Sequence, residues 1–140
     1  MAVRDANRTL HPVHAVLLAA TIPLFMGALI SDIAYSNSYQ VQWTNFASWL
    51  IAGGLVFNSF ALLWTVIDRL RAGDRGRRPT LYFLLLLAAT FVLGFFNSLI
   101  HAKDAWAAMP AGLILSLIVF ILALAATWLG FSNLRAGESK

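Results

Sequence analysis

The chain has 140 residues, of which 60% are hydrophobic and only 11% are charged, and its mean hydropathy is +0.75. A soluble domain of this size needs far more charge to cover its surface, so the composition favours an integral membrane protein. The sequence has no cysteine, which excludes disulfides, iron–sulfur ligation and a cysteine nucleophile.

Four runs without Asp, Glu, Lys or Arg predict four transmembrane helices. Each run supplies the roughly 20 apolar residues that span about 30 Å of hydrocarbon. Backbone groups in lipid must be hydrogen-bonded within their own segment, so the spans should be helices rather than strands. Connections of roughly 7 to 11 residues make consecutive helices antiparallel neighbours. We therefore predict an all-α, up-down-up-down four-helix bundle in a single transmembrane domain, residues 1–140, with helices at about 12–33, 45–69, 80–101 and 109–130.

The expected first helix, 12–33, begins with the motif H-P-V-H. Pro12 suits the first turn of a helix, where its missing N–H costs nothing. His11 and His14 are spaced i, i+3 and could chelate one metal ion, with Asp68 from the end of the second helix as a third ligand. The alternative is that the imidazoles contact lipid headgroups or a neighbouring helix. Asp32 lies about 27 Å further along the first helix than His14 and so belongs to another layer.

Asn58 falls near the middle of the expected second helix, 45–69. A carboxamide at that depth should turn inward to a hydrogen-bond partner rather than face lipid. Pro23, at similar depth in the first helix, removes a backbone donor and frees the carbonyl of Ala19. That carbonyl is one candidate partner. We interpret Asn58 as a structural polar residue in preference to part of a transport pathway.

The expected third helix, 80–101, ends in the stretch NSLIHAKD. Asn97 and His101 are one turn apart and face the same way, and Asp32 should reach the same depth from the first helix. A histidine–aspartate pair across two helices could bind a divalent metal or relay a proton. The alternative is a structural hydrogen bond that clamps two helix ends. Asn97 is a second structural polar residue of this layer.

Small residues spaced four apart recur in all four expected helices. Close approach of small residues favours helix association in lipid, either within one bundle or between copies in a homo-oligomer. The pairs are Gly27/Ser31, Ser48/Ala52, Gly94/Ser98 and Gly112/Ser116.

The distribution of charge predicts the orientation. With four spans, both termini and the 70–79 loop share one side of the membrane. That side carries nine Arg and Lys residues and the other side carries only Lys103, so both termini should be cytoplasmic in an inner membrane. The basic loop RLRAGDRGRR lies where anionic headgroups attract it, so we expect it to contact lipid and not nucleic acid.

Haem and serine-nucleophile chemistry are disfavoured within one chain. Bis-histidine ligation needs imidazoles on opposing helices at one depth. His11 and His14 share a helix, however, and His101 lies across the membrane, so only a dimer could bring two copies of His11 or His14 together. A nucleophilic set around His101 would depend on a serine, and serines in tightly packed membrane helices usually serve packing.

The stretch LHPVHAVLLAATIPLF, followed by SDIAY, resembles the opening of a bacterial family of four-helix inner-membrane proteins catalogued as domain of unknown function 2231. The likeness continues through VIDRL to NSLIHAKDAW and PAGLILS and so covers nearly the whole chain. Some relatives are similar proteins fused to a Rieske iron–sulfur domain, which implies a redox partner protein for a chain without cysteine. The residues that the resemblance singles out, without implying a reaction, are His11, Pro12, His14, Asp32, Asp68 and His101.

These patterns leave two functions open. The first is an accessory membrane protein with a polar site at one membrane face for a metal ion, a lipid headgroup or a quinone headgroup. The second is a structural or assembly protein that oligomerises through its small-residue helix faces. An enzyme and haem bound across a dimer are the weaker interpretations.

Overall fold

The computed structural model describes residues 10–72 and 81–138, with side chains up to Ser132. In these ranges the chain forms five helices and no strand. The helices are α1 (Pro12–Ser38), α2 (Val41–Arg71), α3 (Leu81–His101), the one-turn α4 (Ala105–Ala108) and α5 (Ala111–Glu138).

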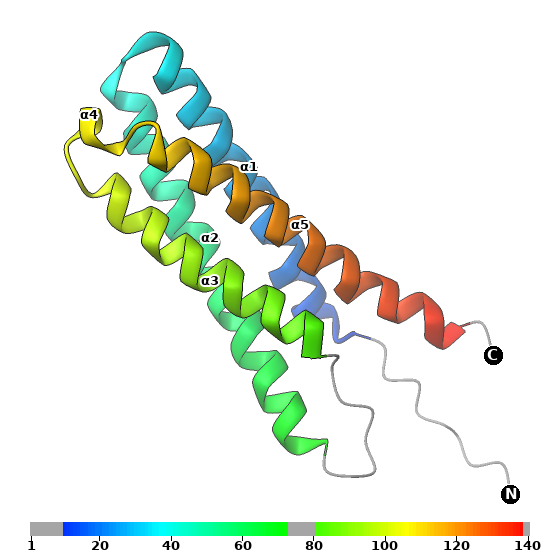
Figure 1. Ribbon diagram of the computed structural model, residues 1–140. Coiled ribbons are helices and arrows are strands. Elements are labelled where there is room, and N and C mark those ends of the chain that lie inside the picture. The colour runs from blue at the N-terminus through cyan, green and yellow to red at the C-terminus, as the bar shows by residue number, and fades with distance from the viewer. Residues whose placement is uncertain (1–9, 73–80, 139–140) are drawn as a thin grey trace, which may run out of the picture.

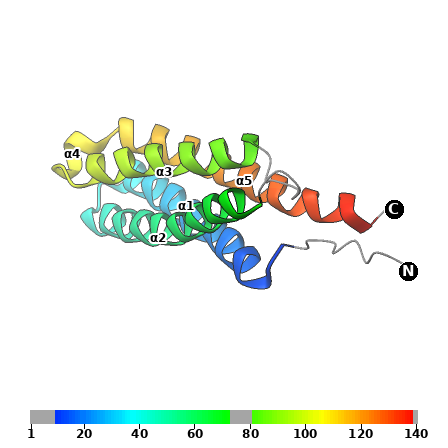
Figure 2. The same cartoon turned by 90° about the horizontal axis from the view of Figure 1, so that it is seen from below.

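The four long helices form an antiparallel bundle in which sequence neighbours are also spatial neighbours. The principal contacts join α1 to α2, α2 to α3, α3 to α5, and α5 back to α1, so the helices close into a ring. Figure 1 shows the α1–α2 turn, α4 and the start of α5 together at one end, and Figure 2 shows α3 and α5 lying over α1 and α2. We call the end that carries α4 the α4 end, and the other the opposite end. The predicted all-α, four-helix arrangement is confirmed.

All four long helices are long and apolar enough to cross a membrane by length and composition. Their outward faces carry large apolar side chains that would be unfavourable in water but suit lipid. The most exposed of these residues include Trp49, Leu70, Tyr82 and Trp128.

The connection between α1 and α2 is much shorter than the sequence predicted. We expected a connection over residues 34–44, but α1 continues to Ser38 and α2 begins at Val41. The polar residues that suggested a loop bond back onto the helix instead: Asn37 Nδ2 donates to the Ile33 carbonyl at 2.7 Å and Ser38 Oγ to Ala34 at 2.7 Å. Tyr39, with φ of 54°, then ends α1 in the left-handed region.

Asn58 does not contact the carbonyl of Ala19, so this predicted partner was wrong. Its Nδ2 donates to the carbonyl of Leu87 on α3 at 3.1 Å, and the side chain is buried. Pro23 and Ala19 lie on the exposed face of α1, whereas Asn58 lies on the core face of α2. The inward orientation of Asn58 and its structural hydrogen bond agree with the expectation.

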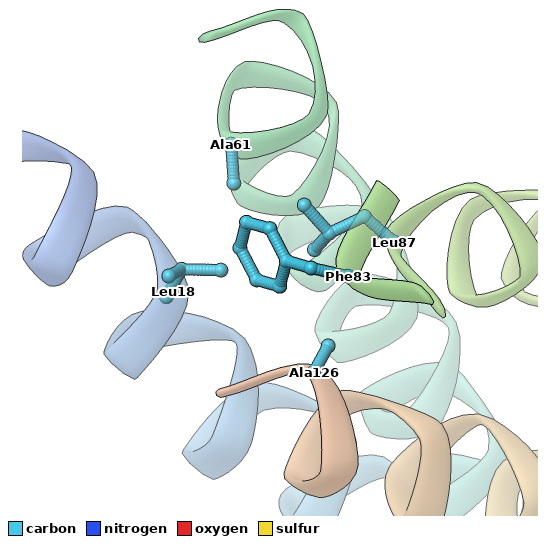
Figure 3. Close-up of a cluster of buried hydrophobic side chains, with 5 residues drawn as sticks. All are labelled: Leu18, Ala61, Phe83, Leu87 and Ala126. Carbon is cyan, nitrogen blue, oxygen red and sulfur yellow. The ribbon is translucent and has the colours of Figure 1, made fainter. Parts of the chain in front are cut away.

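The apolar core has two parts along the bundle. Figure 3 shows the first, in which one or two residues from each long helix meet: Leu18, Ala61, Phe83, Leu87 and Ala126. The second, nearer the α4 end, consists of Phe25, Val119 and Ala123. Gly54 is required beside it, because a Cβ at this position would lie 2.6 Å from Cε1 of Phe25.

Most of the predicted small-residue pairs serve packing within the chain. Ser31, Gly94, Gly112 and Ser116 are all buried in the bundle. The Ser48/Ala52 pair differs, because Ser48 is half-buried and Ala52 is exposed on α2.

Candidate functional site

Asp32 is the centre of a buried polar cluster at the α4 end. Its side chain is 0% exposed although it lies in a membrane-spanning helix. Oδ1 is 2.8 Å from Nε2 of His101 on α3, and Oδ2 accepts a hydrogen bond from Oγ of Ser116 on α5 at 2.5 Å. The expected contact between Asp32 and His101 is present. One carboxylate therefore links three of the four long helices.

Asn97 completes this cluster from α3. Its Nδ2 donates to Oγ of Ser116 at 2.8 Å, and its backbone carbonyl lies 2.9 Å from Nδ1 of His101. We call Asp32, Asn97, His101 and Ser116 the Asp32 cluster. Asn97 was predicted as a structural polar residue of this layer, but the sequence reasoning treated Ser116 only as a packing residue.

A glycine on α5 makes room for the imidazole of the Asp32 cluster. A Cβ at Gly112 would lie 2.9 Å from Cε1 of His101. The Gly112/Ser116 pair thus has two roles. Gly112 leaves room for the ring of His101. Ser116, one turn later on α5, donates a hydrogen bond to Asp32, which is the partner of His101. This spacing on one helix face is the signal that could have assigned Ser116 to the cluster.

Two buried oxygens near this end lack partners. Among the described residues, Oδ1 of Asn97 and Oγ1 of Thr44 are the buried side-chain atoms with no hydrogen-bond partner. A buried polar atom without a hydrogen-bond partner is unusual and calls for an explanation such as a bound ion or water.

His14 is buried at the opposite end in a different environment. Its Nε2 lies 3.3 Å from Oγ1 of Thr65, which in turn donates to the carbonyl of Ala61 at 2.8 Å. The ring of His14 stacks on Trp64 with centroids 5.9 Å apart, and the exposed ring of His11 lies 5.0 Å from the same indole. We call His11, His14, Trp64 and Thr65 the His14 cluster.

The structure does not bring His11, His14 and Asp68 together as a metal site. Within residues 10–72 and 81–132, no three His, Asp or Glu side chains form a group that could hold a metal ion. Nδ1 of His11 instead accepts from the backbone N–H of Val13 at 3.3 Å and caps α1. Asp32 and His101 remain as a two-ligand prediction at the α4 end.

The Asp32 cluster does not have the arrangement of a serine nucleophile. A nucleophilic serine donates to the imidazole that will take its proton, and the carboxylate lies behind that imidazole. Here Ser116 donates to the carboxylate itself. The cluster can therefore connect helices, share a proton or bind a cation, but its geometry offers no activated hydroxyl.

Four apolar helices around buried polar clusters define an integral membrane four-helix bundle. The chain belongs to the family described as "Predicted membrane protein (DUF2231)", whose model matches residues 10–134. That description gives a membrane protein and assigns no molecular role. The searches of curated proteins and of solved structures found no match.

Proposed function

We propose that the protein is an accessory protein of the inner membrane, folded as a single domain, in which the Asp32 cluster clamps α1, α3 and α5 together. The observation that carries this proposal is the bonding of Asp32, because each carboxylate oxygen contacts a different neighbouring helix. In lipid an unpaired carboxylate is costly, so these contacts strongly favour one arrangement of the helices.

A double-mutant cycle tests the clamp. Asp32→Ala, His101→Ala and the double variant are unfolded in mixed micelles, and their free energies of unfolding are compared. We expect an interaction free energy of about 0.5–3 kcal/mol between the two sites, because they are in direct contact. Strictly additive losses would refute the clamp.

The proposal places both termini in the cytoplasm and the Asp32 cluster near the periplasmic face. Its support is the excess of Arg and Lys on one side, including Arg71 at the end of α2, against Lys103 on the other. The chain has no cysteine, so single cysteines report position directly. In intact cells without their outer membrane, Lys103→Cys should react with a membrane-impermeant maleimide and Arg71→Cys should not. If Arg71→Cys reacted and Lys103→Cys did not, the termini would lie on the periplasmic side instead.

The His14 cluster supports a second candidate, a contact site for a lipid or quinone headgroup. The supporting observation is the exposed imidazole of His11 beside the half-buried ring of Trp64, at the end where anionic headgroups would gather. Titrating the protein with a soluble quinone should quench tryptophan fluorescence, and Trp64→Phe should remove most of that response. Electron transfer would need a redox partner protein, since the chain has no cysteine for iron–sulfur ligation.

A homo-oligomer would use α2. The Ser48/Ala52 pair is the one that turns partly outward, while the other pairs contribute buried residues to the bundle. Light scattering of the detergent complex, compared for the wild-type chain and Ala52→Phe, tests this interface.

A further inference from the structure

The hydrogen bonds of His101 fix which of its nitrogens faces Asp32 as an acceptor. A backbone carbonyl can only accept, so Nδ1 of His101 carries the hydrogen that it donates to Asn97. In a neutral imidazole, Nε2 then presents a lone pair. This lone pair lies 2.8 Å from Oδ1 of Asp32, which is also an acceptor. Two acceptors at this distance require a cation between them, either a proton or a metal ion.

The orientation of the Asn97 amide follows from the same reasoning. Ser116 has one hydroxyl hydrogen and donates it to Asp32, so Oγ of Ser116 must accept from Nδ2 of Asn97. This leaves Oδ1 of Asn97 without a donor in the described part of the chain, although the residue is 0% exposed. The cluster therefore contains an additional buried oxygen that a cation would satisfy.

We propose that Asp32, Asn97 and His101 bind one divalent transition-metal ion. Its ligands are Nε2 of His101, the carboxylate of Asp32 and Oδ1 of Asn97. A mixed nitrogen and oxygen set suits ions such as Zn²⁺ and Co²⁺, whereas Mg²⁺ and Ca²⁺ prefer oxygen alone. The bond from Nδ1 of His101 to a backbone carbonyl is the outer contact that commonly orients a metal-binding imidazole.

Two of the three proposed ligand atoms need only a small separation to admit the ion. Zinc–nitrogen and zinc–oxygen bonds of about 2.0–2.2 Å place two tetrahedral ligands about 3.3 Å apart. Nε2 of His101 and Oδ1 of Asp32 are 2.8 Å apart, so they must separate by about 0.5 Å. The ion takes the position of the hydrogen between these atoms, which leaves as a proton. His101 ends α3 and is followed by the exposed residues 102–104, so the site lies close to the membrane face although its paired side chains are buried.

This inference deepens the proposed clamp and rests on it, because the clamp brings the ligands together. The variant Asp32→Asn distinguishes the metal site from the clamp. The amide nitrogen of Asn can donate to Nε2 of His101 and its oxygen can accept from Ser116, so the helices stay connected while the anionic ligand is lost. The opposite end supplies a matched control, His14→Gln combined with Asp68→Asn, which removes the same residue types from outside the site.

The test is a titration of chelator-treated, full-length protein in detergent with Co²⁺, followed by visible absorption. We expect one ion per chain, binding at least about 100-fold weaker in Asp32→Asn, and unchanged binding in the control. Absence of stoichiometric binding in the wild-type chain, or binding that persists in both Asp32→Asn and His101→Gln, would overturn the site. The clamp is judged separately, from unfolding of the metal-free protein.

A second measurement decides the question if Asp32→Asn does not fold. X-ray absorption of the zinc-loaded wild-type protein should show oxygen ligands and a single imidazole, since His101 is the one histidine at the α4 end. A zinc coordination shell that contains no imidazole, or two imidazoles, would overturn the proposed ligand set.

Discussion

The two ends of the bundle hold their buried polar side chains in different ways. At the α4 end, Asp32 is fully buried and bonded to both α3 and α5. At the opposite end, His14 makes a longer contact of 3.3 Å with Thr65 and packs its ring against Trp64. A carboxylate in lipid requires strong partners, whereas a neutral imidazole tolerates stacking and one weak hydrogen bond. The comparison indicates that stability depends mostly on the α4 end.

Removing Asp32 should have the largest effect. We expect Asp32→Ala to lower the free energy of unfolding by about 3–5 kcal/mol, because the change leaves His101 and Ser116 buried without their partner. Unfolding in mixed micelles measures the loss. The control is Asp104→Ala, an exposed aspartate at the same end, which should change stability by less than about 0.5 kcal/mol. Equal losses of unfolding free energy in the two variants would contradict the claim that the buried carboxylate contributes more to stability than the exposed one.

Adjacent glycines in α2 test the packing between the two ends. Gly54→Ala places a Cβ 2.6 Å from Phe25 and should cost about 1–3 kcal/mol through overpacking. Gly53→Ala meets Leu24 at 3.5 Å, which is ordinary contact, and should be neutral or slightly stabilising. Thermal unfolding of both variants measures the difference in their stability. If Gly53→Ala proved as costly, helix flexibility rather than close packing would explain the glycines.

Asn58→Leu should have a smaller effect. It removes the bond to the Leu87 carbonyl, and hydrogen bonds between membrane helices contribute about 0.6 kcal/mol on average, with a maximum of about 1.7. Ser59→Ala is the neighbouring control, because Ser59 bonds only to Leu55 of its own helix in the described contacts. A loss above about 3 kcal/mol would show that the middle of the bundle matters as much as the α4 end.

The smallest effect is expected at His14. His14→Phe keeps an aromatic ring against Trp64 and loses the weak polar interactions of the imidazole, including the 3.3 Å contact with Thr65, so we expect a change of less than about 1 kcal/mol. His101→Phe, the same exchange at the other end, leaves Oδ1 of the buried Asp32 carboxylate without its partner and should cost about 3 kcal/mol or more. Similar losses in the two variants, measured by unfolding in micelles, would contradict the comparison of the two ends.

Hydropathy and depth predicted the fold and part of the candidate site. Four apolar runs predicted the helices because only helices satisfy their backbone in lipid. Counting turns placed Asp32 and His101 in one layer, and the structure brings them into contact. Depth alone does not give the rotation of a helix, however, which is why the partner of Asn58 was wrong and the bond from Ser116 was missed.

The helix ends were harder to predict. Ser36, Asn37 and Ser38 have the composition of a loop, but their side chains bond to carbonyls of the preceding turn and extend α1. Local composition cannot distinguish these two outcomes, because the same side chains can serve a turn or a helix. The short α4 was missed because four residues carry too little periodicity to predict a helix.

The unequal lengths of the helices have a consequence for the surrounding bilayer. At 1.5 Å per residue, the 31 residues of α2 measure about 46 Å and the 21 residues of α3 about 32 Å. A hydrocarbon layer about 30 Å thick matches α3 but is shorter than α2, so α2 must tilt or extend into the headgroups. Thicker membranes should favour an upright α2 and strain α3, and the tilt of this protein should therefore change with lipid chain length.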